Sequence, residues 1–174
     1  MAKTMLFKNL KTMTNQSQNL FIVEDNQENA IKLHSFLKAR FGTIYNIFTF
    51  TNAIQAISNI DKHTSIIVLD YDYFGEEGNQ IVGTIKTVNP NTKVIILANN
   101  DDIQTEIEAF VNGADNYLLK QKGVRNQLSR SIFDEIKYQA NYIKSRYSVS
   151  QAVVFLILLI SMIAVIVALG MEYL

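Results

Sequence analysis

The sequence predicts an α/β domain in which five parallel strands form a doubly wound sheet. Between Asn19 and Lys120, five short apolar runs alternate with stretches of helical periodicity. Most of the runs are nearly continuous in apolar residues, as expected of strands covered on both faces. The stretches between them have the length and pattern of the crossover helices in βα repeats.

The predicted strands occupy the five apolar runs in chain order. They are LFIVED at 20–25, TIYNIFTF at 43–50, SIIVLD at 65–70, KVIILA at 93–98 and NYLLK at 116–120. In an open α/β sheet, ligands bind at the carboxyl ends of the strands. The residues that end these runs are therefore the first candidates for a functional site.

Four helices are predicted between the strands from their periodicity and end signals. The first has an apolar stripe, and the second has Asn52 as its candidate N-cap. The third stops before Asn89-Pro90, and the fourth ends at Asn112-Gly113, a typical C-terminal pair. Their predicted ranges are 28–40, 52–60, 80–88 and 101–111.

The fifth helix is predicted to begin after Gly123 and to continue without a break toward the C-terminus. Apolar residues recur every three or four positions from Val124 to Tyr147, with no proline or glycine between them. The last helix of a small α/β domain needs only about three or four turns. Residues 136–150 are therefore predicted to be a helical stalk after a domain at 19–135. A homodimer through the stalk or the following segment is a hypothesis.

Residues 151–170 are predicted to form a single transmembrane helix. From Ala152 to Leu169 the chain has no charge, and only Ser161 interrupts the apolar residues. A helix of that length rises about 27 Å, close to the hydrocarbon thickness of a bilayer. The alternative is a buried core helix, which is disfavoured because the segment is apolar all round.

The flanks of this span predict its orientation. Arg146 precedes it, whereas the tail at 171–174 has no basic residue, and Tyr147 and Tyr173 stand where aromatic rings favour the membrane interface. The positive-inside rule therefore predicts a tail-anchored, single-pass protein whose domain faces the cytoplasm. The polar extension at 1–18 has no apolar core and is not expected to be a signal peptide.

Composition excludes several kinds of function. The 16 basic and 16 acidic residues cancel, which argues against nucleic acid as a partner. The chain has no cysteine, so disulfides, thiol catalysis and cysteine-ligated zinc are excluded. His34 and His63 stand apart, one in a predicted helix and one in a loop, which argues against a metal role for either.

Charged residues end three of the predicted strands. The first ends in Glu24-Asp25, the third in Asp70 and the fifth in Lys120. Asp72 follows two residues after Asp70 and shares its face on an extended chain. Converging carboxylates need a cation, and hard oxygen ligands suit Mg²⁺. An aspartate in that setting can take a phosphoryl group as an acyl phosphate, with a lysine opposite to hold a phosphoryl oxygen.

The motifs FIVEDN, IIVLDYDYFGEEG, VIILANNDD and GADNYLLK, in this order, resemble the receiver domain of bacterial response regulators, the CheY-like superfamily. The resemblance covers residues 19–135 and implies a flavodoxin-like fold in two-component phosphorelay signalling. It implies Mg²⁺ as the cofactor and a sensor histidine kinase or phosphotransfer protein as the partner. It implies no enzyme activity beyond self-phosphorylation and slow autodephosphorylation. With the predicted span, it places the chain in the bacterial inner membrane.

The resemblance assigns a role to each acid and to the lysine. Asp70 would be the phospho-acceptor and a metal ligand, and Asp25 would bind Mg²⁺ directly. Glu24 would act mainly through coordinated water. Asp72 would offer its backbone carbonyl to the metal while its side chain modulates the site. Lys120 would contact the phosphoryl group.

Two further positions match the family, and two of its prolines are replaced. Gly78 matches a glycine that the family places eight residues after the phospho-acceptor. Tyr117 matches an aromatic residue that changes rotamer on activation. The family's prolines after the acceptor and after the lysine are Phe74 and Gln121 here.

The sequence departs from the family at the position that reports phosphorylation. The switch Thr or Ser at the end of the fourth strand is Ala98, and the small residue after it is Asn99. Loss of the hydroxyl removes a hydrogen bond toward the phosphoryl group. Asn99 and Asn100 are the candidate substitute donors.

Two other functions remain alternatives. Asp70-Tyr71-Asp72 also fits the Asp-x-Asp motif of haloacid-dehalogenase-like phosphatases, but that family places the motif on its first strand and leaves Glu24-Asp25 unexplained. The other alternative is a non-switching pseudo-receiver that serves as a membrane scaffold or adaptor, which Ala98 favours and the complete acid set disfavours. No DNA-binding motif follows the predicted domain, so output through a membrane protein complex is expected.

Overall fold

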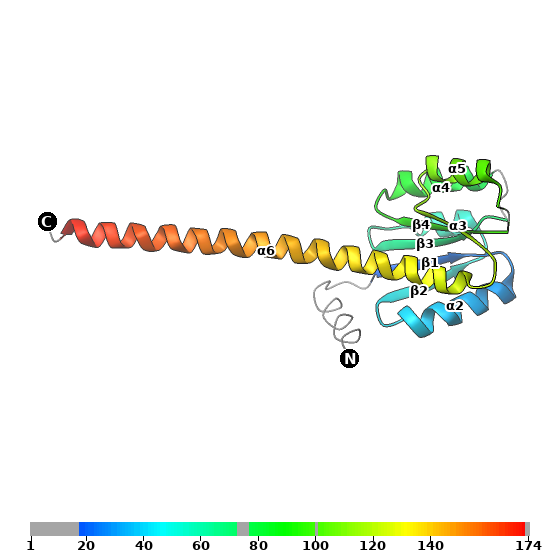
Figure 1. The fold of residues 1–174 in the computed structure, drawn as a ribbon, viewed down its shortest axis with the longest axis horizontal. Coiled ribbons are helices and arrows are strands. Elements are labelled where there is room, and N and C mark those ends of the chain that lie inside the picture. Colours follow the sequence, from blue (N-terminus) through cyan, green and yellow to red (C-terminus); the bar gives the residue numbers. More distant parts are fainter. Residues whose placement is uncertain (1–17, 73–76, 100, 173–174) are drawn as a thin grey trace. The chain divides into compact units, whose positions relative to one another are not determined.

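The computed structural model describes residues 18–72, 77–99 and 101–172 (Figure 1). It divides into two compact units, Met1–Ile132 and Phe133–Leu174. Residues 1–17 of the predicted extension, together with Phe74, Asn100 and Tyr173, lie outside the described residues.

The first unit contains a five-stranded parallel sheet in the order β2-β1-β3-β4-β5. The strands are β1 (Gln18–Val23), β2 (Tyr45–Phe50), β3 (Thr64–Asp70), β4 (Lys93–Ala98) and β5 (Asn116–Leu119). The predicted α/β class with a flavodoxin-like sheet is confirmed. The central strand β3 is buried along its whole length, while the edge strands β2 and β5 are more open.

The order of the strands reverses at β1, and this reversal positions the functional site. β1 pairs with β2 on one side and with β3 on the other. Val23, the last residue of β1, lies in register with Leu69, directly before the end of β3. The carboxyl ends of β1 and β3 are therefore neighbours at the position where open α/β sheets bind ligands.

Four helices connect the strands of the first unit. They are α2 (Gln27–Phe41), α3 (Ala53–Ser58), α4 (Glu77–Val88) and α5 (Ile103–Val111). The predicted N-cap Asn52 is confirmed, since its side-chain oxygen accepts a hydrogen bond from the Ile54 N–H at 2.7 Å. α5 begins later than predicted because Asp102 is its N-cap, accepting from the Thr105 N–H at 3.0 Å.

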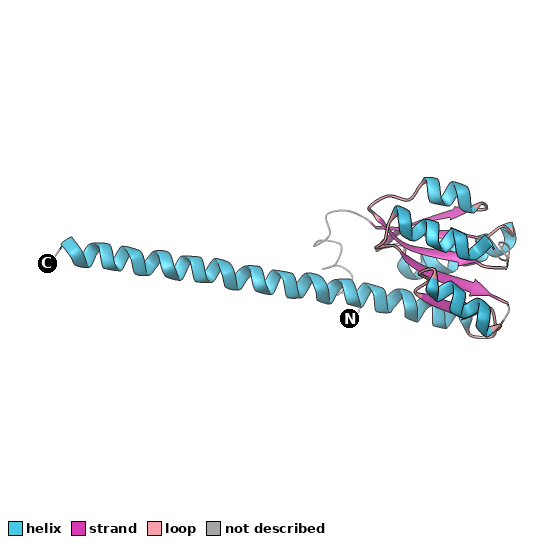
Figure 2. Cartoon of the chain, turned by 90° about the horizontal axis from the view of Figure 1, so that it is seen from above, coloured by secondary structure: helices cyan, strands magenta, loops and turns pink. Residues whose placement is uncertain are grey.

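Helices cover both faces of the sheet (Figures 1 and 2). Alternate strand residues point to opposite faces, so Phe21 and Val23 belong to one layer and Leu20 and Ile22 to the other. The first layer lies against α3, α4 and α5 in a single buried cluster that includes Ala53, Val82 and Ala109. On the other face, the Arg40 guanidinium of α2 donates to the Ser129 hydroxyl at 3.1 Å, near the start of the last helix.

The last helix, α6 (Val124–Glu172), is continuous, as its periodicity predicted. Leu128 and Ile132 of its apolar stripe are buried. Among the described residues, no helix is long and apolar enough to cross a membrane, so the transmembrane helix predicted at 151–170 is not found. The described side chains of that segment are those of 153–163. A helix of that length rises only about 16 Å, roughly half of the hydrocarbon thickness.

Asp115 ties α4 to the amino-terminal ends of β4 and β5. Its carboxylate accepts from the Lys86 ammonium at 2.7 Å, the Lys93 ammonium at 3.0 Å and the Val94 N–H at 2.9 Å. Burial raises the pKa of Asp115, but these hydrogen bonds outweigh burial and hold the pKa below its usual value. Gly113, two residues before Asp115, has a φ of +104°, which a residue with a Cβ adopts only with strain.

Replacing Asp115 with Asn is expected to lower the free energy of unfolding at pH 7 by about 1–3 kcal/mol, because charge-assisted hydrogen bonds are lost. Since the folded-state pKa is depressed, the contribution of Asp115 is full above the unfolded pKa of about 4 and disappears as pH falls through the folded value. Urea denaturation of the full chain at several pH values measures the difference. The exposed Asp134→Asn is the matched control, and an equal loss in both variants would contradict the role of Asp115.

Candidate functional site

Three carboxylates meet at the adjoining ends of β1 and β3. Glu24 and Asp25 follow β1, and Asp70 ends β3. One carboxylate oxygen from each lies within 4.8 Å of the others. Glu24 and Asp70 are each only 4% exposed, whereas Asp25 is open to solvent. The structure therefore brings together the three acids that the sequence predicted as metal ligands.

The pKa of Glu24 reflects both its burial and the nearby negative charge of Asp70. Burial, a hydrogen bond with Asp70 and the charge of Asp70 together raise the pKa of Glu24 to about 7, against smaller opposing effects of the Asn26 N–H and Lys120. A hard divalent cation would relieve this repulsion, and a donor set made of carboxylate oxygens suits Mg²⁺. The residues present thus fit the metal that the family resemblance implies.

Lys120 is the cation of the site. Its ammonium donates to both oxygens of Asp70 at 2.5 Å and to Asp72 Oδ2 at 2.8 Å. Burial lowers the pKa of Lys120, but the hydrogen bonds that it donates to Asp70 and Asp72 outweigh burial and raise the pKa above its usual value. The lysine is therefore charged at neutral pH and sits where a phosphoryl group on Asp70 would need a counter-charge.

Backbone hydrogen bonds continue beyond the strand ends and hold the site's loops together. The Tyr71 N–H donates to the Leu97 carbonyl at 2.8 Å, one residue past β3. The Lys120 N–H donates to the Ala98 carbonyl at 2.7 Å, one residue past β5. The side chains that follow β3, β4 and β5 are consequently delivered to a single rim of the sheet.

Asn99 contacts Asp72, a pairing that sequence reasoning missed. The Asn99 backbone N–H donates to Asp72 Oδ1 at 2.9 Å, and its side-chain amide donates to Asp72 Oδ2 at 2.7 Å. The sequence predicts Asn99 as a substitute donor to the phosphoryl group, whereas in the structure both of its hydrogen bonds go to Asp72. The acid that Asn99 contacts depends on the register of the strands and on the rotamer of the Asn99 side chain.

At the two switch positions, Ala98 has no hydroxyl and Tyr117 pairs with the ring of Tyr71. Ala98 is fully buried at the end of β4. Tyr117 is half-buried, and its ring lies 6.2 Å from the Tyr71 ring in an edge-to-face arrangement. Burial, and then the charges of Tyr71 and Asp72, raise the pKa of Tyr117. The described residues contain no cis peptide bond, so the bond before Gln121 is trans.

Gly78 is required by the Tyr71 ring. A Cβ added at Gly78 would lie 2.5 Å from Tyr71 Cε2 and 2.8 Å from Cδ2. The glycine expected at this position from the family resemblance therefore has a steric reason in this chain, where the residue after Asp70 is a tyrosine.

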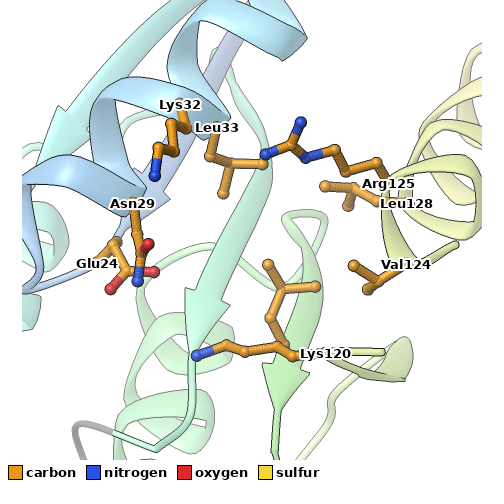
Figure 3. Close-up of a pocket in the computed structure, with 9 residues that line it drawn as sticks. Glu24, Asn29, Lys32, Leu33, Lys120, Val124, Arg125 and Leu128 are labelled. Atoms are coloured by element: carbon orange, nitrogen blue, oxygen red, sulfur yellow. The ribbon is translucent and has the colours of Figure 1, made fainter. Parts of the chain in front are cut away.

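A pocket of about 180 Å³ opens beside the acids on the α2 and α6 face (Figure 3). Glu24 and Lys120 belong both to its lining and to the site. Leu33, Leu97, Val124 and Leu128 supply apolar walls, and Asn29, Lys32 and Arg125 complete the lining. Its polar residues on α2 and α6 carry no motif in the sequence and were not predicted.

The two histidines lie away from this site. His34 Nδ1 is 3.0 Å from the Thr49 hydroxyl, and the backbone N–H of His63 donates to Asp61 Oδ1 at 3.0 Å. Neither belongs to the group of acids that could hold a metal ion among the described residues.

A family model described as the response regulator receiver domain matches residues 20–132. The chain belongs to the response regulator receiver family. Receiver domains act in two-component signalling, take part in phosphorelays with histidine kinases or phosphotransfer proteins, and are generally signalling domains with no enzymatic role.

Curated relatives match the receiver part of the chain. The transcriptional regulatory protein ZraR of Klebsiella oxytoca is 26% identical over 109 residues, which are 62% of this chain and 24% of that protein. The cell cycle transcriptional regulator CtrA of Caulobacter vibrioides is 24% identical over 101 residues, which are 58% of this chain and 43% of that protein. The chain thus spans less than half the length of these relatives.

Solved structures share the fold. A CheY-like response regulator receiver domain protein from Methanospirillum hungatei has a TM-score of 0.59 and 17% identity, covering 75% of this chain and 99% of that chain. A response regulator from Thermotoga maritima has a TM-score of 0.57 and 20% identity, covering 70% and 99%.

Replacing Gly78 with Ala is expected to destabilise the fold by about 1–3 kcal/mol, because the Tyr71 ring must move. Gly83→Ala in the same helix is the matched control, since its Cβ would meet nothing closer than 3.7 Å. That control should stabilise by about 0.5–1 kcal/mol through helix propensity. Thermal and urea unfolding measure both. Combining Gly78→Ala with Tyr71→Ala should remove most of the Gly78 effect, and an additive double variant would disprove the steric explanation.

Proposed function

We propose that this receiver accepts a phosphoryl group on Asp70 and passes the signal on through protein contacts. The observation that carries the proposal is the buried Asp70 carboxylate: the two acids that follow β1 lie close to it, and the Lys120 ammonium donates to both of its oxygens. A buried carboxylate needs a neighbouring positive charge. The Lys120 ammonium that offsets the charge of Asp70 would also offset the charge of a phosphoryl group on it.

The proposed reaction is transfer from a phosphohistidine or an acyl phosphate. An Asp70 carboxylate oxygen attacks phosphorus, the bond from phosphorus to the donor breaks, and the donor leaves with the bonding electron pair. Lys120 stays protonated and contacts the phosphoryl oxygens. Glu24, Asp25, Asp70 and the backbone carbonyl of Asp72 would hold Mg²⁺. When bound, the ion supplies positive charge against the phosphoryl oxygens.

The pocket beside Asp70 supports the approach of an anionic donor. Lys32 and Arg125 line it together with Lys120. Cationic side chains around a cleft favour an incoming phosphorylated partner electrostatically. A sensor histidine kinase or a phosphotransfer protein is therefore the proposed donor.

Ala98 supports a second candidate function, that of a pseudo-receiver that acts as a scaffold without switching. Its position at the end of β4 is buried and has no hydroxyl to donate to a phosphoryl group. The phosphatase alternative is less well supported, because Asp70 ends the third strand of the chain and Lys120 already engages it.

Incubation of the full chain with acetyl phosphate and Mg²⁺ is expected to add one phosphoryl group, and Asp70→Asn should abolish the addition. Chelation of Mg²⁺ and Asp25→Asn should each slow it by at least about tenfold, since charge compensation is lost. Intact-mass spectrometry and Phos-tag gels measure the product, with Asp134→Asn as the matched control. An unmodified wild type would favour the scaffold, and multiple turnover of phosphate monoesters would favour the phosphatase.

We also propose, from the sequence, that residues 151–170 attach the chain to the bacterial inner membrane with the receiver in the cytoplasm. All described side chains at 153–163 are exposed, and all except Ser161 are apolar. Exposed apolar surface on every side of a helix is unfavourable in water, which supports a lipid or protein cover. A membrane complex would then receive the output, and homodimerisation through residues 136–150 or 151–170 stays a prediction.

Fractionation of cells expressing the full chain is expected to place it in the membrane fraction, resistant to a carbonate wash. A variant with Leu156→Lys and Ile160→Lys should move to the supernatant, because each charge at the centre of a span costs about 2.5–3.5 kcal/mol. Thr87→Lys with Thr84→Lys adds the same charge on α4 as a control. A wild type recovered in the supernatant would contradict membrane attachment.

A further inference from the structure

Asp72 is held mainly by one neighbour. Asn99 provides two of the three hydrogen bonds that the described residues donate to the Asp72 carboxylate, one from its backbone and one from its side chain. One residue thus grips both oxygens of the carboxylate. The bidentate contact fixes the orientation of Asp72 across the gap between the loops that follow β3 and β4.

The third hydrogen bond comes from Lys120, which is shared between two acids. Its ammonium lies 2.8 Å from Asp72 Oδ2 and 2.5 Å from Asp70 Oδ2. An ammonium has three protons to donate and no more. Any phosphoryl oxygen that Lys120 contacts must therefore compete with the carboxylates that it already serves.

We propose that Asn99 is a positioning residue that satisfies Asp72, so that Lys120 can turn from Asp72 to the incoming phosphoryl group. This inference rests on the proposed phosphorylation of Asp70. With Asn99 in place, Asp72 keeps two donors when the ammonium leaves. Without the Asn99 side chain, Asp72 Oδ2 depends on Lys120 and retains it. Asn99 thereby acts on phosphoryl transfer through Asp72, with no contact of its own to the phosphoryl group.

Asn99 is well placed for this role because the loops are fastened beneath it. The backbone hydrogen bonds from Tyr71 to Leu97 and from Lys120 to Ala98 join the chain directly before Asp72, directly before Asn99 and at Lys120 itself. Asp72, Asn99 and Lys120 therefore meet at a fixed separation. A change of partner by the ammonium needs only a side-chain rotation.

The test is a double-mutant cycle on the rate of Asp70 phosphorylation in the full chain. Acetyl phosphate is the donor: Asp70 attacks phosphorus, the bond to the acetyl oxygen breaks, and acetate leaves with the electron pair. Asn99→Ala removes the side-chain hydrogen bond and keeps the backbone one. It is expected to slow phosphorylation by about 3- to 10-fold, the range that the net contribution of one typical hydrogen bond provides.

The cycle separates this role from a general loss of structure. In an Asp72→Ala background the Asp72 carboxylate no longer competes for Lys120, so adding Asn99→Ala should change the rate less than about 1.5-fold, as expected for a residue that acts only through its partner. Asn91→Ala, in an exposed turn before β4, is the matched control and should change neither rate.

Each outcome decides a different question. An equal slowing by Asn99→Ala in both backgrounds, or no slowing in either, overturns the role of Asn99 while phosphorylation of Asp70 stands. A wild type that takes no phosphoryl group contradicts the proposed function, and the role of Asn99 with it. A slowing seen only when Asp72 is present supports the inference.

Discussion

The ammonium of Lys120 is the interaction on which the functional end of this receiver depends. The carboxylates of Asp70, which ends β3, and of Asp72, in the loop that follows, lie within hydrogen-bond distance of it, and Glu24 lies beside Asp70 in a buried position. Without that cation, the like charges would have to be protonated or moved into water. Burial, and then the hydrogen bond with Asp70 and its charge, raise the pKa of Glu24 to about 7 although Lys120 opposes them, and a divalent cation among the three acids would offset their repulsion.

The sheet makes this arrangement possible by carrying its hydrogen bonds past the ends of the strands. Pairing of Tyr71 with Leu97 and of Lys120 with Ala98 leaves the loops little freedom where they begin. The side chains that follow can therefore be close without a covalent or metal link. The aromatic pair of Tyr71 and Tyr117 fills the neighbouring space, and Gly78 leaves room for it.

Stability and chemistry are separated to opposite ends of the sheet. At the amino-terminal ends of β4 and β5, Asp115 is fully engaged by two lysines and a backbone N–H. At the carboxyl ends, Lys120 is shared among acids and can change partners. The Asp115 carboxylate, whose hydrogen-bond partners are all in place, contributes to folding. The acids at the carboxyl ends of the strands have too little positive charge near them and can bind a cation.

The sequence by itself determined the fold and the members of the acid cluster. Continuous apolar runs identify parallel strands, and parallel strands present their carboxyl ends at one edge, so Glu24, Asp70 and Lys120 were expected on the same edge of the sheet. Only the tertiary structure decided that Asn99 donates hydrogen bonds to Asp72 and that the Tyr71 ring occupies the space where a Cβ at Gly78 would lie. Those contacts depend on register, rotamer and steric fit between residues distant in the chain, and residue order alone carries no signal for them.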